Sequence, residues 1–124
     1  MAARHYIKLT LGLSQLVREI ESQAIAAQQQ IGLVRTQMAS KQREMRLAQL
    51  TRSEISSLPP DTAVYEGVGK MFVGLPVPTL QEKLSSQVKE NETELEALSK
   101  RLHYLETTDK NSREHIEKML KGQA

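Results

Sequence analysis

The sequence predicts a mainly α-helical protein in which two long helices form an antiparallel coiled coil and are joined by one β-hairpin. Apolar residues recur at alternating steps of three and four over 13–38 and again over 84–119, which is the spacing of a coiled-coil seam. The segment 64–73 between them is apolar without that spacing. Aromatic residues are only 3% of the 124 residues, which suits a thin helix–helix seam. We therefore expect 1–124 to form a single structural unit.

The first long helix is expected over 5–50. Lys41 and Arg52 fall where apolar seam residues are expected, so the seam should weaken toward the end of this helix. The expected seam residues are Tyr6, Leu13, Ile20, Ala27 and Val34 at one heptad position, and Val17, Ala24, Ile31, Met38 and Met45 at the other.

A separate short helix is expected over 51–58. The run Thr51-Arg52-Ser53-Glu54 has the spacing of a capping box, in which the threonine side chain caps the helix and the glutamate reaches back. Pro59 and Pro60 would end this helix, because a proline disfavours helical geometry in the residue before it.

A β-hairpin is expected over 62–74. Gly67-Val68 could form a two-residue turn with glycine first, but a longer loop through Gly69 also fits the sequence. Prolines at 76 and 78 would end the second strand, since proline cannot donate to a ladder. The shorter turn would pair Tyr65 with Lys70 and Val64 with Met71.

The second long helix is expected over 79–121, opened by a capping box at Thr79–Glu82. Two long helices of nearly equal length, linked by residues 51–78, most simply pack antiparallel. Asn91 is a lone polar seam residue of the kind that fixes register. Asp109 and Ser112 also occupy seam positions, and we expect the two helices to part there.

A lone two-stranded hairpin is marginally stable in water and has two unpaired edges. This one is apolar on both faces, and one thin helix pair could cover only one of them. We therefore expect several chains to join their hairpins into a common sheet or closed barrel; the alternative is a hairpin folded back on its own helices. The expected subunit-interface residues are Val64, Tyr65, Gly67, Val68, Gly69, Met71, Phe72 and Val73.

The order helix, hairpin, helix resembles the β-type subunits of prefoldin. The resemblance covers essentially the whole chain, and the hairpin segment 65–73, together with 50–55 before it, carries its specificity. Two features depart from the family pattern: Lys70 stands where arginine is expected, and the loop Gly74–Pro78 has atypical prolines.

The resemblance implies a heterohexameric cytosolic chaperone. Two α-type and four β-type subunits would join their hairpins into a double β-barrel, from which six coiled-coil arms project. The tips of the arms would hold unfolded actin, tubulin and other clients and pass them to the cytosolic chaperonin, without a nucleotide or other cofactor.

Apolar residues at the two chain ends are the candidate client-binding residues. If the seam weakens at Asp109 and Ser112, these side chains would be partly exposed, and exposed apolar residues with flexible methionine suit promiscuous binding. Ordinary seam packing to the helix ends is the alternative. The candidates are Tyr6, Ile7, Leu9, Leu11, Leu13, Ile116, Met119 and Leu120.

The composition argues against catalytic and metal-binding roles. There is no cysteine, hence no disulfide, thiolate ligand or cysteine nucleophile. No Ser–His–acid arrangement is evident, and His5, His103 and His115 are best explained as solvated helix residues. Gly67-Val68-Gly69 lacks the third glycine and the following helix of a phosphate loop. We expect no enzyme activity, metal or cofactor.

Nucleic acid and membrane partners are also not expected. Basic and acidic residues are interspersed, Glu44 interrupts the basic cluster around Lys41–Arg52, and no apolar run approaches the length of a membrane span. No secretory signal is apparent, so a cytoplasmic location is expected. The competing function is that of a structural coiled-coil tether or scaffold subunit, whose hairpin docks on a dissimilar partner.

Overall fold

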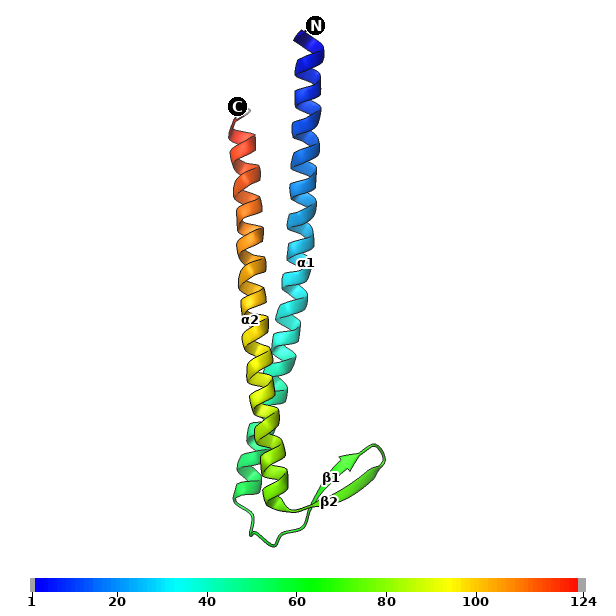
Figure 1. The fold of residues 1–124 in the computed structure, drawn as a ribbon, viewed down its shortest axis with the longest axis vertical. Helices are drawn as coiled ribbons and strands as arrows, with labels where there is room; N and C mark the ends of the chain where they lie inside the picture. The colour runs from blue at the N-terminus through cyan, green and yellow to red at the C-terminus, as the bar shows by residue number, and fades with distance from the viewer. Residues whose placement is uncertain (1, 123–124) are drawn as a thin grey trace. The chain divides into compact units, whose positions relative to one another are not determined.

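The computed structural model describes residues 2–122 and contains two helices joined by a hairpin (Figure 1). The elements are α1 (Ala2–Ser56), β1 (Val64–Val68), β2 (Met71–Leu75) and α2 (Val77–Gly122). The predicted fold class is confirmed. The chain divides into two compact units: the first combines the chain up to Thr36 with the part from Ser99 onward, and the second is Gln37–Leu98.

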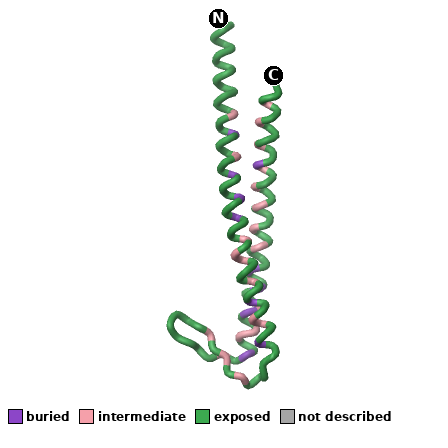
Figure 2. The backbone as a smooth tube through the Cα atoms, turned by 180° about the vertical axis from the view of Figure 1, so that it is seen from behind, coloured by how far each residue is buried: buried purple, intermediate pink, exposed green. Residues whose placement is uncertain are grey.

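In the first unit, α1 and α2 pack along a seam whose residues follow the predicted spacing. The buried positions recur at steps of three and four because each helix presents one apolar stripe to the other (Figure 2). The α1 stripe includes Ile20, Ala27, Ile31 and Val34, all buried, and α2 contributes the half-buried Leu102, Leu105, Ile116 and Met119. Tyr6 and Leu13, also predicted for the seam, are instead exposed.

In the second unit, three segments share one apolar core: the end of α1, the base of the hairpin at Val64, which we call the hairpin root, and the start of α2. The buried members of this core are Ala48, Ile55, Val77, Leu84 and Val88, and Met45, Val64 and Leu80 pack against them. Lys41 lies on the seam as predicted, half-buried, and its ammonium forms an ion pair with Glu94 at 2.7 Å. Asn91 is buried at the seam position predicted for it.

The predicted short helix over 51–58 is wrong, because α1 continues through this segment to Ser56. The Thr51 hydroxyl donates to the carbonyl oxygen of Leu47 at 2.8 Å, one turn back, and so does not cap a new helix. The Leu58 amide donates to the Ile55 carbonyl at 3.0 Å, which closes the last turn before Pro59.

The second helix begins at Val77, before the predicted capping box at Thr79–Glu82, which is therefore wrong. The Leu80 amide donates to the carbonyl oxygen of Pro76 at 3.1 Å, so Thr79 already lies inside the helix. Pro78 occupies the first turn, where a backbone N–H has no helical acceptor and proline is tolerated.

The hairpin turn lies two residues later than the predicted Gly67-Val68. The antiparallel register pairs Val68 with Met71, which leaves Gly69 and Lys70 as the turn. Gly69 has φ of 61°, a left-handed conformation that glycine adopts without a steric penalty. A glycine does occupy the first turn position, as predicted, but it is Gly69.

Candidate functional site

One face of the hairpin consists of two aromatic residues and two glycines. Tyr65 pairs with Gly74 and Gly67 pairs with Phe72, and side chains two residues apart on a strand share a face. A Cβ atom at Gly74 would lie 3.6 Å from Cε1 of Tyr65, and one at Gly67 would lie 3.9 Å from Cε1 of Phe72. Each ring thus lies beside the glycine opposite, an arrangement that protects glycines in strands.

This aromatic face is open to solvent. Tyr65 is 65% exposed and Phe72 is 78% exposed. Both strands are also edge strands, because the described sheet contains only β1 and β2. The hairpin therefore presents two uncovered rings and two open edges, which is the surface that assembly with further strands would cover.

The opposite face of the hairpin contacts the helices at the hairpin root. Val64 packs against the core of the second unit, and both carboxylate oxygens of Glu66 accept hydrogen bonds from the Lys83 ammonium at 2.6 and 2.7 Å. Farther out, Val68 and Met71 are exposed. The hairpin does not fold back over its helices along its whole length, as the alternative from the sequence required.

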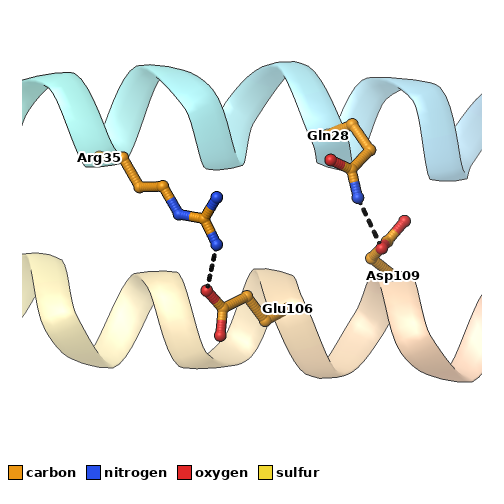
Figure 3. Close-up of polar contacts among 4 residues, drawn as sticks. All are labelled: Gln28, Arg35, Glu106 and Asp109. Carbon is orange, nitrogen blue, oxygen red and sulfur yellow. Dashed lines mark hydrogen bonds and ion pairs between the residues drawn. The ribbon is translucent and has the colours of Figure 1, made fainter.

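In the first unit, a polar contact lies where the helices were expected to part. The Gln28 amide nitrogen Nε2 donates to Oδ2 of Asp109 at 2.7 Å, and Asp109 is only 8% exposed (Figure 3). Arg113, one turn farther along α2, adds an ion pair to Oδ2 at 3.2 Å. The predicted parting at Asp109 is therefore wrong, and half-buried Ser112 shows that the seam continues past it.

The start of α1 is uncovered. Every residue from Ala2 to Leu16 is exposed, and in Figure 2 this stretch is coloured as exposed throughout. Gly122 lies as many residues after Asp109 as Gln15 lies before Gln28. Because the two helices are antiparallel, Gly122 is level with Gln15, and the described part of α2 does not reach the turns of α1 before Gln15.

The two groups of candidate client-binding residues therefore differ in environment. Those on α1 are all exposed, whereas Ile116 and Met119 on α2 are half-buried in the seam and Leu120 is exposed. The predicted arrangement, in which the two groups face each other at splayed tips, is wrong. The exposed α1 candidates are Tyr6, Ile7, Leu9, Leu11 and Leu13, to which the structure adds Leu16.

Sequence reasoning missed the polar contacts that hold these surfaces. Lys83 and Glu66 come together only because the hairpin root returns beside α2, and Gln28 meets Asp109 only in one antiparallel register. Lys41 makes a third such contact, with Glu94 across the seam of the second unit. This hydrogen bond raises the pKa of the Lys41 ammonium above its ordinary value of 10.5.

Metal-ligand groups and membrane-spanning helices are both absent from the described residues. Between Ala2 and Gly122, no group of three or more His, Asp or Glu side chains is arranged to hold a metal ion. Within the same range, no helix is long and apolar enough to cross a membrane. The candidate surfaces are the hairpin and the start of α1, which both expose large apolar side chains.

Comparison with known proteins gives concordant similarities in sequence and fold. A family model described as prefoldin subunit matches residues 18–123. The chain is 30% identical over 107 residues to "Probable prefoldin subunit 1" of Schizosaccharomyces pombe, covering 86% of this chain and 96% of that protein. It is 31% identical over 110 residues to prefoldin subunit 1 of Homo sapiens, covering 89% and 90%. The crystal structure of the prefoldin beta subunit from Thermococcus strain KS-1 superposes with a TM-score of 0.77 at 29% identity, covering 83% of this chain and 90% of that one.

Proposed function

Because this chain belongs to the prefoldin subunit family, we propose that it is a β-type subunit, most like prefoldin subunit 1, of a heterohexameric chaperone that holds unfolded proteins. Family membership carries the coarser role, that of a chaperone subunit assembled with other prefoldin subunits. The proposal adds a particle of two α-type and four β-type chains in the cytoplasm. It would hold actin, tubulin and other unfolded clients without nucleotide and deliver them to the cytosolic chaperonin.

The exposed aromatic face of the hairpin carries the assembly part of this proposal. Tyr65 and Phe72 are large side chains left in solvent on one face of a described sheet with two open edges. Neighbouring hairpins would cover the rings and pair the edges, which lowers the free energy by burying apolar area and satisfying backbone groups. The Glu66–Lys83 ion pair supports this role by fastening the hairpin root to α2.

The exposed start of α1 carries the client-holding part. Tyr6, Leu9 and Leu13 are uncovered apolar side chains on a regular helix, and no acidic residue precedes Glu19. Exposed apolar patches of this kind mark interaction sites. Six weak sites held in one particle would raise the effective concentration of each for an unfolded chain already bound at another.

The direct test is suppression of aggregation by the assembled particle. We expect the triple variant Tyr6→Ser, Leu9→Ser, Leu13→Ser to assemble normally but to lose most of its suppression of aggregation of chemically unfolded actin. Its matched control is Ile25→Ser, Leu33→Ser, which removes two exposed apolar side chains on the part of α1 that α2 covers on its other side. The control should suppress aggregation as the unmodified particle does. Undiminished suppression by the triple variant would contradict the client-holding role.

A further inference from the structure

The apolar residues at the start of α1 are arranged as a stripe rather than scattered. Tyr6, Leu9, Leu13 and Leu16, which we call the open stripe, follow one another at steps of three, four and three. On an α-helix this spacing places side chains on one face. The next step leads to Ile20, which is buried against α2. Tyr6 and Leu13 hold the heptad position of Ile20 and so continue the seam of the first unit, and Leu9 and Leu16 lie beside them.

The open stripe is therefore one half of a coiled-coil interface. Farther along α1, the same face is covered by α2, which buries Ala27 and Ile31. On the first turns that cover is missing, and all four residues of the open stripe are exposed. The match to the prefoldin subunit model starts at residue 18, so the open stripe also lies outside the part of the chain that the family model describes.

The borders of the open stripe are small or uncharged. Ala3 and Thr10 lie along one border, and His5 and Gly12 lie along the other. The Thr10 hydroxyl is already bonded to the Tyr6 carbonyl oxygen at 2.9 Å, so it needs no polar partner. A second helix could therefore approach this face closely, as α2 does along the rest of the seam.

The charges on this segment are all of one sign. Arg4, Lys8 and Arg18 are the charged side chains before Glu19, with histidine counted as neutral. They lie on the side of the helix away from the open stripe, so they do not contact a partner bound there directly. They set a positive potential around the segment, which favours the approach of an acidic partner at low salt, where the screening length is about 30 Å at 0.01 M.

We infer that the open stripe binds acidic amphipathic helices of client proteins, which take the place along α1 that α2 occupies farther on. The inference rests on the proposed chaperone function and names the class of client segment: one with apolar residues at heptad spacing and a net negative charge. An anionic membrane surface fits less well. Membrane-surface helices gather their apolar residues on one broad face, whereas the exposed Ile7 and Leu11 lie opposite the open stripe, on the charged side of this segment.

The test measures binding of labelled peptides to the assembled particle by fluorescence anisotropy. The first peptide is an acidic helix with leucine at heptad spacing, the second has the same composition in scrambled order, and the third carries lysine in place of glutamate. We expect the first to bind about tenfold more tightly than either of the others at low salt. Equal binding of the first and second peptides would overturn the inference.

Two variants separate the open stripe from general apolar character. Leu9→Ser, Leu13→Ser, Leu16→Ser removes most of the open stripe, whereas Ile25→Ser, Leu33→Ser removes two exposed apolar residues from the part of α1 that α2 covers on its other side. The first variant should weaken binding of the acidic heptad peptide about tenfold and the second by no more than about twofold. Equal losses would overturn the helical mode of binding.

The same variants distinguish failure of the inference from failure of the proposed function. If both variants lose suppression of actin aggregation equally, client holding stands and the inference fails. If neither loses suppression, the proposed function fails at this site, and the inference falls with it. The particle is also tested against vesicles of phosphatidylcholine and phosphatidylserine. If it binds these vesicles, loses that binding in the open-stripe variant and binds none of the peptides, the open stripe is a membrane contact and the inference is overturned.

Discussion

Gln28 and Asp109 join the two helices of the first unit through a hydrogen bond of 2.7 Å between Nε2 and Oδ2 (Figure 3). Asp109 is nearly buried, and its second partner, Arg113, is mostly exposed. A buried carboxylate is tolerated on a seam only when it is hydrogen-bonded. The pair therefore converts an unfavourable seam residue into one that favours a single antiparallel register.

Replacing only one member of this pair should destabilise the first unit. We expect Gln28→Leu to lower the free energy of local opening by about 1–2 kcal/mol, because it leaves the Asp109 carboxylate without its partner on α1. Hydrogen exchange of the amides around Ile31 and Leu105, measured in the assembled particle, reports that opening. Glu114→Ala, on the exposed side of α2, is the control and should leave exchange unchanged.

Replacing both members should restore or increase stability. The double variant Gln28→Leu, Asp109→Leu removes the buried charge together with its partner and extends the apolar seam, which is often neutral or stabilising. Exchange in the double variant should be as slow as in the unmodified chain, or slower. Faster exchange than in Gln28→Leu alone would show that the polar pair itself holds the helices together.

The Lys41–Glu94 ion pair should contribute stability that depends on pH at the alkaline end. The hydrogen bond to Glu94 raises the pKa of Lys41 above 10.5, so the folded state binds this proton more tightly than the unfolded state does. The contribution is therefore fully present below 10.5 and is lost as pH rises through the raised pKa. The stability difference between the unmodified chain and Glu94→Gln should be constant from neutral pH to about pH 10 and shrink above it. A difference that disappears near neutral pH would contradict this assignment.

The conformation of Gly69 should make the turn intolerant of side chains. Its φ of 61° costs a β-branched residue about 1–2 kcal/mol or more, so Gly69→Val should reduce the yield of assembled particle. Lys70→Val, at the neighbouring turn position without positive φ, is the control. Yield is measured by size-exclusion chromatography after coexpression with the partner subunits. Equal yields from the two variants would place the turn elsewhere.

Reversing the charge of Lys83 should destabilise the hairpin, and reversing the charge of Glu66 as well should restore its stability. Lys83→Glu places two carboxylates together at the hairpin root and should loosen the hairpin, whereas Lys83→Glu, Glu66→Lys restores opposite charges. Lys83 is about half exposed, so the loss should be no more than about 1 kcal/mol and should decrease with added salt. Hydrogen exchange of the β1 and β2 amides measures it. Failure of the double variant to recover would assign the effect to packing of the Lys83 stem.

The element types and the seam could be predicted because they follow from spacing alone. Ile20, Ala27 and Val34 are buried where the heptad pattern places them, and polar Lys41 and Asn91 occupy the seam positions expected of them. Spacing carries this information because one apolar face per helix suffices to define a two-helix interface.

The ends of the helices and the position of the turn could not be predicted from the sequence. In each case two residues carried the same local sequence feature, and only the folded structure shows which one is used. Thr51 and Thr79 both have capping-box spacing, yet one continues α1 and the other lies inside α2. Gly67 and Gly69 could each begin the turn. The observed register places Gly67 opposite Phe72 and assigns the turn to Gly69, whose positive φ suits glycine.

The candidate site was predictable in its residues but not in its geometry. The hairpin face was predicted from its apolar sequence, and the apolar residues of α1 were predicted from their place at the chain end beside a weakened seam. The parting of the helices at Asp109 was not a sound expectation, because a charged seam residue disrupts packing only when nothing on the facing helix satisfies it. Gln28 does so, and its role emerges only once the register is known.

Stoichiometry after coexpression tests the central claim, that the exposed hairpin builds a shared sheet with other prefoldin subunits. The chain is coexpressed with two α-type and further β-type partners, and the product is analysed by size-exclusion chromatography with light scattering. We expect a six-chain particle that is lost when Tyr65 and Phe72 are both replaced by serine and is retained in the Ile25→Ser, Leu33→Ser control. A folded monomer, or an elongated dimer or trimer unaffected by the Tyr65 and Phe72 replacements, would contradict the account.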